Sequence, residues 1–208
     1  MARGRLIVIS APSGAGKTTL VKSLLTRNPN FVFSISYTTR AMRPGERDGV
    51  DYRFVTKREF KALVAADELL EWAEVFDNFY GTSRADVDAE RRRGRHVVLE
   101  IDWQGARQVR AAVPDCRSIF ILPPSVGSLR ERLVGRKNST GAKDDIERRL
   151  RDSLTDLAHW DEFDYVVVND AVERATDELE GIALGRLRRN RVGTQTTADR
   201  VAAILAAG

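Results

Sequence analysis

The stretch Ala11-Pro12-Ser13-Gly14-Ala15-Gly16-Lys17-Thr18 decides the fold of this 208-residue chain. It follows a continuous apolar run, Leu6-Ile7-Val8-Ile9, and precedes a segment with apolar residues at helical spacing. The run predicts a strand buried on both faces, and the segment predicts a helix that ends at Asn28-Pro29. A strand, a glycine-containing turn and a helix in this order are typical of a parallel α/β sheet.

The same eight residues match the pattern G-x-x-x-x-G-K-[ST], with Ala11 in place of the first glycine. Glycines let consecutive backbone N–H groups curl around a phosphate, and the lysine reaches the outer phosphate oxygens. The hydroxyl of Thr18 is then a ligand for Mg²⁺. Ala11 is tolerated if its φ angle stays negative, because its side chain is still small. The sequence therefore predicts a phosphate-binding loop at the N-terminus of a helix.

Composition limits the classes of protein that fit. The chain has 34 Lys and Arg against 30 Asp and Glu, a mild excess that suits polyphosphate ligands better than extended nucleic acid. Its apolar runs are shorter than the roughly 20 residues that cross a bilayer. One cysteine, Cys116, allows no internal disulfide, and the short start from Met1 to Gly4 runs directly into a strand. We expect no signal peptide and a cytoplasmic location.

Further buried strands are predicted at 97–102, 118–122 and 163–168, separated by helical segments. This alternation predicts a P-loop NTPase-type doubly wound parallel sheet made of residues 1–35 and 86–190. Residues 36–85 break the alternation and predict an inserted α+β lobe, in which Thr56 and Glu59 form a helix capping box.

Two other segments stand apart from the core. The polar stretch 136–143 lies between arginine-rich helices and predicts a helical lid over about 126–158. The tail 191–208 is expected to be frayed or docked on a partner. Its apolar residues Val201, Ile204 and Leu205 fit either a dimer interface or packing on the chain's own core.

Glu100 and Asp102 end a predicted buried strand. In a P-loop protein a carboxylate at this place can hold Mg²⁺ or its waters, and Asp102 is our candidate for contact through a water. An acidic residue after a strand is also a common helix N-cap or a solvated strand end. Both interpretations stay open on the sequence.

An ordered set of motifs resembles the guanylate kinase family, within the P-loop nucleoside monophosphate kinases. The motifs are Ser36-Tyr37-Thr38-Thr39-Arg40, Arg43-Pro44-Gly45-Glu46, Gly49-Val50-Asp51-Tyr52, Glu71-Trp72-Ala73-Glu74, Tyr80-Gly81-Thr82, Ile101-Asp102-Trp103-Gln104-Gly105, Pro123-Pro124-Ser125 and Val168-Asn169-Asp170. They extend the resemblance from Leu6 to about Leu187.

The resemblance implies a GMP-binding lobe at 36–85. Its predicted GMP-binding residues are Ser36, Arg40, Arg43, Tyr52, Glu71, Tyr80, Thr82, Glu100 and Asp102. Arginine forks and tyrosine hydroxyls suit a monophosphate dianion. Guanine presents N–H donors that need acceptors such as the Glu71 carboxylate, whereas adenine would leave that group without partners.

The resemblance also implies an ATP site and a catalytic set. The predicted ATP-binding residues are Ala11, Pro12, Ser13, Gly14, Ala15, Gly16, Lys17, Thr18, Thr19 and Asn169. The predicted catalytic residues are Lys17, Arg40, Arg132, Arg136 and Arg149, with Arg148 as the alternative to Arg149. Asn169 is implied to contact the donor adenine, although an asparagine at a strand end also serves to form a turn.

These assignments imply transfer of the γ-phosphate of ATP·Mg²⁺ to GMP, and to dGMP, giving ADP and GDP. Catalysis would come from alignment of the two substrates and neutralisation of charge on the transferring phosphate, with lid closure excluding water.

Two alternative functions stay open. They are a non-catalytic guanylate-kinase-like interaction module and a kinase for another base. The basic runs at 91–95 and 186–191 favour solvated helix faces over a nucleic-acid site. We expect no nucleic-acid or membrane partner, and the oligomeric state stays open.

Overall fold

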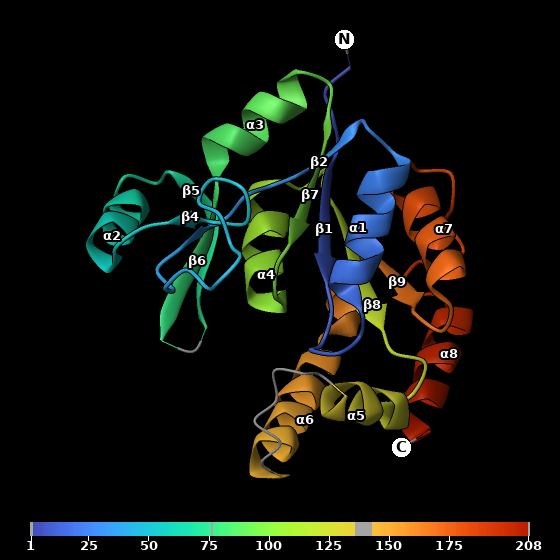
Figure 1. Cartoon of the computed structure of the whole chain (residues 1–208). Helices are drawn as coiled ribbons and strands as arrows, with labels where there is room; N and C mark the ends of the chain where they lie inside the picture. Colours follow the sequence, from blue (N-terminus) through green and yellow to red (C-terminus); the bar gives the residue numbers. More distant parts are fainter. Residues whose placement is uncertain (1, 76, 136–142, 208) are drawn as a thin grey trace. The chain divides into compact units, whose positions relative to one another are not determined.

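The computed structural model describes residues 2–75, 77–135 and 143–207, with only the backbone of 143–146 (Figure 1). Arg136 and most of the predicted polar lid stretch lie outside the described residues. The chain forms two compact units. Unit 1 comprises residues 1–8 and 29–116, and unit 2 comprises residues 9–28 and 117–208.

The central sheet has five strands in the order β2-β7-β1-β8-β9. Its strands are β1 (Leu6–Ser10), β2 (Phe31–Phe33), β7 (His96–Glu100), β8 (Arg117–Leu122) and β9 (Tyr165–Val168). The β2–β7 and β8–β9 pairs are parallel. Every residue of β1 is buried, as its unbroken apolar sequence predicts. The predicted α/β class with a mainly parallel sheet is confirmed.

The second sheet belongs to unit 1 and has the order β4-β3-β6-β5. Its strands are β3 (Tyr37–Thr38), β4 (Arg53–Phe54), β5 (Leu69–Val75) and β6 (Asn78–Ser83). The helix α2 (Lys57–Ala65) lies between β4 and β5 in the sequence and begins at the predicted capping box. The Thr56 hydroxyl accepts from Glu59 N at 3.2 Å, and the Glu59 carboxylate accepts from Thr56 N at 2.7 Å. This box is confirmed.

An irregularity in this sheet sets the position of one side chain. Leu69 pairs with Ser83, yet Glu71 pairs with Thr82, so the register shifts by one residue between Leu69 and Glu71. A bulge of this kind places an extra residue on one strand and re-aims the side chains that follow it. Three consecutive residues of β5, Leu69, Leu70 and Glu71, are buried as a result.

The remaining helices are α1 (Lys17–Arg27), α3 (Arg84–Arg92), α4 (Trp103–Ala112), α5 (Val126–Val134), α6 (Lys143–Leu157), the short 3₁₀ helix η1 (Trp160–Glu162), α7 (Val172–Ala183) and α8 (Gln195–Ala206). Several of them have a side-chain N-cap. The side chains of Ser83, Asp102 and Ser125 each accept from a backbone N–H in the first turn of the helix that follows.

Cys116 is buried at the end of unit 1. None of the helices in the described part of the chain has the length and apolar character needed to cross a membrane.

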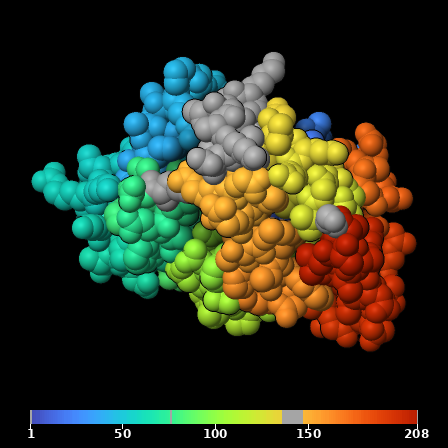
Figure 2. All heavy atoms as spheres, turned by 90° about the horizontal axis from the view of Figure 1, so that it is seen from below, coloured from blue at the N-terminus to red at the C-terminus, as the bar shows by residue number. Residues whose placement is uncertain are grey.

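The tail is helical rather than frayed, and of the two alternatives for its apolar residues the structure shows packing on the chain's own core. Residues 195–206 form α8, whose N-cap Thr194 accepts from Thr197 N at 3.3 Å. Val201 and Ile204, three residues apart, are 1% and 5% exposed, whereas Leu205 is 44% exposed. The apolar face therefore packs on unit 2 itself, and the red C-terminal segment in Figure 2 is a compact part of the surface.

The packing of α8 can be tested with one pair of neighbouring substitutions. We expect Ile204→Ala to lower the free energy of unfolding by about 2–4 kcal/mol, because it leaves a cavity among buried side chains. Leu205→Ala should change it by less than about 0.5 kcal/mol. Urea denaturation of both variants measures the difference, and equal effects would show that the tail does not pack as described.

Candidate nucleotide-binding sites

The predicted phosphate loop in unit 2 joins β1 to α1 and has the backbone that the pattern requires. Gly14 and Gly16 have φ angles of 91° and 90°, in the left-handed region that residues with a Cβ rarely adopt. Ala11 keeps a negative φ, as its place in the motif demands. The first turn of α1, which the structure describes completely, carries no acidic side chain. The positive end of the α1 dipole is therefore available to an anion.

The loop is held at the carbonyl of Ala15 by a buried asparagine. Asn169 follows β9 and is 3% exposed, and its Nδ2 donates to the carbonyl of Ala15 at 2.7 Å. A Cβ on residue 16 would lie 2.2 Å from that Nδ2 and would displace the amide from its bond to Ala15. Arg132 of α5 donates to the Ala15 carbonyl at 3.4 Å and to the Asn169 carbonyl at 3.2 Å.

This role of Asn169 was not foreseen from the sequence. The predicted contact with a donor adenine stays a prediction, and the structure adds that the side-chain amide already bonds to the loop. The neighbouring carbonyl of Leu122 accepts from Asn169 N at 2.8 Å, which ties the asparagine to the end of β8. The register of two parallel strands therefore fixes where the amide meets the loop.

A second element of unit 2 contacts the loop. The Ser153 hydroxyl of α6 donates to the carbonyl of Ser13 at 3.3 Å. Arg149 lies four residues before Ser153 and so shares its helix face, whereas Arg148 projects from a different face. Arg149 is half-buried and Arg148 is exposed. The helix geometry therefore favours Arg149 as the arginine on the loop side of α6.

In unit 1 the bulge in β5 places a carboxyl group against a hydroxyl. Thr82 is fully buried and donates from Oγ1 to Oε1 of Glu71 at 2.6 Å. Glu71 is 4% exposed. Burial raises the pKa of its carboxyl to about 7, with a further contribution from the negative charge of Asp102. The group is thus divided between its neutral and charged forms near neutral pH.

The start of α4 closes against this carboxyl. The Asp102 carboxylate accepts from Gly105 N at 2.7 Å, so the N-cap interpretation of this residue is confirmed. A Cβ on residue 105 would lie 2.6 Å from Oε2 of Glu71. Gln108, one turn on, spans the Trp72 backbone: its Nε2 donates to Trp72 O at 2.8 Å, and its Oε1 accepts from Trp72 N at 3.1 Å. These bonds anchor α4 to β5 beside Glu71.

Arg40 in unit 1 forms an ion pair with Glu46, for which no role was predicted from the sequence. Both terminal nitrogens of its guanidinium donate to the carboxylate of Glu46, at 2.7 and 3.0 Å. The same carboxylate accepts from Arg43 N at 2.8 Å. The bond to Glu46 raises the pKa of Arg40 and lowers that of Glu46. The sequence signal for these contacts was the position of Glu46 close to Arg43 in the same motif.

Aromatic residues surround this arginine. Its guanidinium carbon is 5.3 Å from the ring centre of Tyr52, and the rings of Tyr52 and Tyr80 meet edge to face at 6.0 Å. Burial raises the pKa of Tyr52, and the charges of Tyr80 and Glu100 add to this rise. Arg40, Tyr52, Tyr80 and Glu100 therefore share one neighbourhood.

Each unit contains one of the two predicted sites. Unit 1 contains the whole predicted GMP set, including the half-buried Ser36 just before β3 and the exposed Arg43. Unit 2 contains the loop, Thr19, Asn169 and the described lid arginines.

The residues fit Mg²⁺ only if phosphates supply most of its ligands. Among the described residues no group of three or more His, Cys, Asp or Glu could hold a metal ion. Thr18, exposed in the first turn of α1, offers one hydroxyl oxygen. Mg²⁺ in nucleotide sites commonly takes one or two protein oxygens together with phosphates and water, which matches this donor set.

A mainly parallel α/β sheet with this glycine loop between its first strand and first helix defines a P-loop nucleotide-binding protein. Residues 3–184 match the family model described as guanylate kinase. The chain belongs to the guanylate kinase family.

Individual relatives agree with this family. A guanylate kinase from Chromohalobacter salexigens is 51% identical over 177 residues, covering 85% of this chain and 81% of that one. A guanylate kinase from Hahella chejuensis is 49% identical and covers 94% of this chain and 92% of that one. The crystal structure of guanylate kinase from Anaplasma phagocytophilum aligns with a TM-score of 0.72 at 33% identity, covering 98% and 96% of the two chains.

The raised pKa of Glu71 predicts how stability depends on pH. Between about pH 4.5 and 7 the folded chain keeps a proton that the unfolded chain releases, so the carboxyl destabilises the fold increasingly as pH rises. We expect Glu71→Gln to have little effect near pH 4.5 and to increase the free energy of unfolding above pH 7, by up to about 3 kcal/mol.

Urea denaturation at several pH values measures this effect. Glu74→Gln, at an exposed position of the same strand, is the matched control and should follow the parent chain throughout. A Glu71→Gln difference that does not grow with pH would contradict the assignment of a buried, partly protonated carboxyl.

Proposed function

We propose that this protein transfers the γ-phosphate of ATP to GMP, giving ADP and GDP, and that dGMP is also an acceptor. The single observation that carries the acceptor assignment is the buried carboxyl of Glu71, bonded to Thr82 and closed in by Gly105. Extension to dGMP follows because the predicted contacts address the base and the phosphate and none of them requires the ribose 2′-hydroxyl.

Guanine suits this carboxyl and adenine does not. Guanine presents N1–H and N2–H donors on one edge, and the carboxylate offers two acceptor oxygens. Adenine presents an unprotonated N1 at the same place, which would face the carboxyl oxygen and leave its charge buried without compensation. Two N–H donors stabilise the charged form, so guanine binding lowers the pKa of Glu71 from its raised value.

The acceptor phosphate suits the Arg40 neighbourhood. A carboxylate and a phosphate offer similar oxygen pairs to a guanidinium fork, and in the structure Glu46 occupies that fork. GMP would therefore take over donors that Glu46 holds, with Arg43 and the hydroxyls of Tyr52 and Tyr80 as further partners. Glu46 keeps the fork oriented before substrate arrives.

The donor phosphates suit the loop of unit 2. Its backbone N–H groups and Lys17 would hold ATP, and Thr18 would contribute its hydroxyl to Mg²⁺. When bound, Mg²⁺ neutralises charge on the β- and γ-phosphates. Arg132 and Arg149 would neutralise charge on the transferring group, and Arg136 is proposed for the same task. Phosphoryl transfer of this kind requires alignment and charge stabilisation more than a general base.

The intact loop favours an enzyme over a non-catalytic interaction module. Gly14 and Gly16 keep their left-handed backbone, and Lys17 and Thr18 begin α1. A module that only docks partners has no need for this geometry together with a braced loop.

The first test measures ADP release from ATP·Mg²⁺ with GMP, dGMP, AMP, CMP and UMP as acceptors. We expect turnover with GMP and dGMP only. Lys17→Ala should reduce turnover by about 10²-fold or more, because it removes a charge aimed at the transferring phosphate. Lys22→Ala, at an exposed position of α1, should leave it unchanged. Turnover with another base would contradict the guanine site, and absence of turnover would favour the module.

A second test concerns the contact between Gly105 and Glu71. Gly105→Ala adds a Cβ where Glu71 Oε2 lies and should raise the KM for GMP by about tenfold or more, with the KM for ATP unchanged. Gly127→Ala is the control, because a Cβ there meets only Ser125 Oγ at 3.8 Å. Steady-state kinetics give both constants. An unchanged KM for GMP in a folded Gly105→Ala variant would remove Glu71 from the base site.

A further inference from the structure

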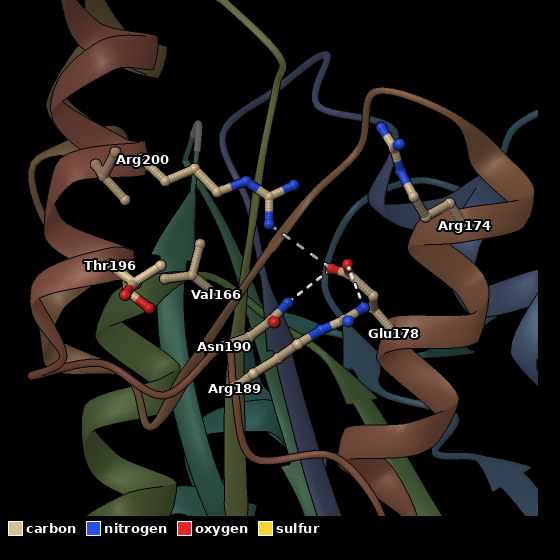
Figure 3. Close-up of a pocket in the computed structure, with 9 residues that line it drawn as sticks. Val166, Arg174, Glu178, Arg189, Asn190, Thr196 and Arg200 are labelled. Carbon is tan, nitrogen blue, oxygen red and sulfur yellow. Dashed lines mark hydrogen bonds and ion pairs between the residues drawn. The ribbon is translucent and has the colours of Figure 1, made fainter.

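A hollow of unit 2 is lined by residues distant in sequence from the phosphate loop, and arginines are among them. It is bordered by α7, α8 and the pair Arg189-Asn190, and has a volume of about 360 Å³ (Figure 3). The lining includes three arginines, Arg174, Arg189 and Arg200, together with Glu178. None of these residues belongs to the predicted nucleotide sites.

The carboxylate of the hollow is already satisfied. Glu178 is 6% exposed, and its Oε2 accepts from Asn190 Nδ2 at 2.6 Å. Its Oε1 accepts from Arg189 at 3.2 Å. Arg174 is paired with Asp170, which does not itself line the hollow. The two carboxylates of Glu178 and Asp170 thus accompany three arginines, and one positive charge is in excess.

Arg200 carries that excess. It projects from α8 toward Glu178 in Figure 3, with its nitrogens 4.0 Å from the Glu178 carboxylate and 3.8 Å from that of Asp170. Both separations are longer than a hydrogen bond. Arg200 is therefore attracted by both carboxylates without a direct hydrogen bond to either, and its forked donors lie in the lining of a hollow that an anion could enter.

The start of α8 adds to the positive potential. Thr196 and Thr197 of its first turn line the hollow, and this turn, all of it within the described chain, has no acidic residue. The valines at the wall, Val166 and Val201, are 3% and 1% exposed, so they offer little apolar surface to a ligand. The lining therefore suits a polar anion rather than an aromatic or aliphatic group.

We propose that this hollow binds a small anion of the diphosphate class through Arg200 and Arg189. The volume exceeds what one phosphate group needs, and two guanidinium forks can each take one phosphate. Binding would replace the long contacts of Arg200 with direct hydrogen bonds. The alternative is that these ion pairs only attach α8 to α7, which would leave the hollow to water.

Nuclear magnetic resonance of the full chain tests the proposal at the hollow itself. Inorganic diphosphate is titrated without metal, and the side-chain amide of Asn190 and the backbone amides of Thr196 and Thr197 are followed. We expect saturable shifts at these three reporters. Reporters at the hollow separate this event from diphosphate bound at the loop, so the result does not depend on the proposed kinase activity.

Two variants make the test specific. Arg200→Gln should weaken the apparent affinity at these reporters at least tenfold, and Arg27→Gln, which removes a surface pair with Asp177 elsewhere in unit 2, should not change it. Urea denaturation confirms that both variants are folded, and Arg189→Gln replaces Arg200→Gln if the latter is not. Shifts that sodium chloride reproduces at equal ionic strength, or that persist equally in Arg200→Gln, would overturn the proposal.

Discussion

The carbonyl of Ala15 is the point on which the phosphate loop depends. It accepts from a buried amide and from an arginine of another helix, and the next residue lacks the Cβ that would displace that amide. Glycine at position 16 is therefore required twice, once by its φ angle and once by the space that Asn169 fills. The loop is shaped by the end of β9 as much as by its own sequence.

In unit 1 the position of the Glu71 carboxyl depends on an irregularity in strand pairing. A register shift in β5 turns Glu71 toward Thr82, and the first turn of α4 then closes over the carboxyl at Gly105, where an added Cβ would displace the carboxyl oxygen. The energetic consequence is a carboxyl group that is partly neutral near neutral pH. Arg40 is also held by a partner within unit 1, because the Glu46 carboxylate accepts from both terminal nitrogens of its guanidinium.

The sequence patterns correctly predicted the structural features that depend on residues adjacent in the chain. The buried strands, the loop and the capping box at Thr56 all follow from residues adjacent in sequence. The bulge at Leu70 was not predicted, because the register shift depends on how β5 pairs with β6, which the residues of β5 alone do not specify. The bonds from Asn169 to Ala15 and from Gln108 to Trp72 join residues far apart in the chain, so no spacing rule reveals them. The apolar residues of the tail were recognised in the sequence, but the surface that they cover was not, because it is formed by distant residues of unit 2.

The burial of Cys116 gives the molecule a practical property. It is the only cysteine in the sequence. Because this residue is 8% exposed, thiol-directed reagents have little access to it on the folded chain. A cysteine introduced at an exposed helix position such as Arg92 would then carry a fluorophore or spin label selectively, without prior removal of the native thiol. Ligand-dependent signals could be assigned to one chosen place in the fold.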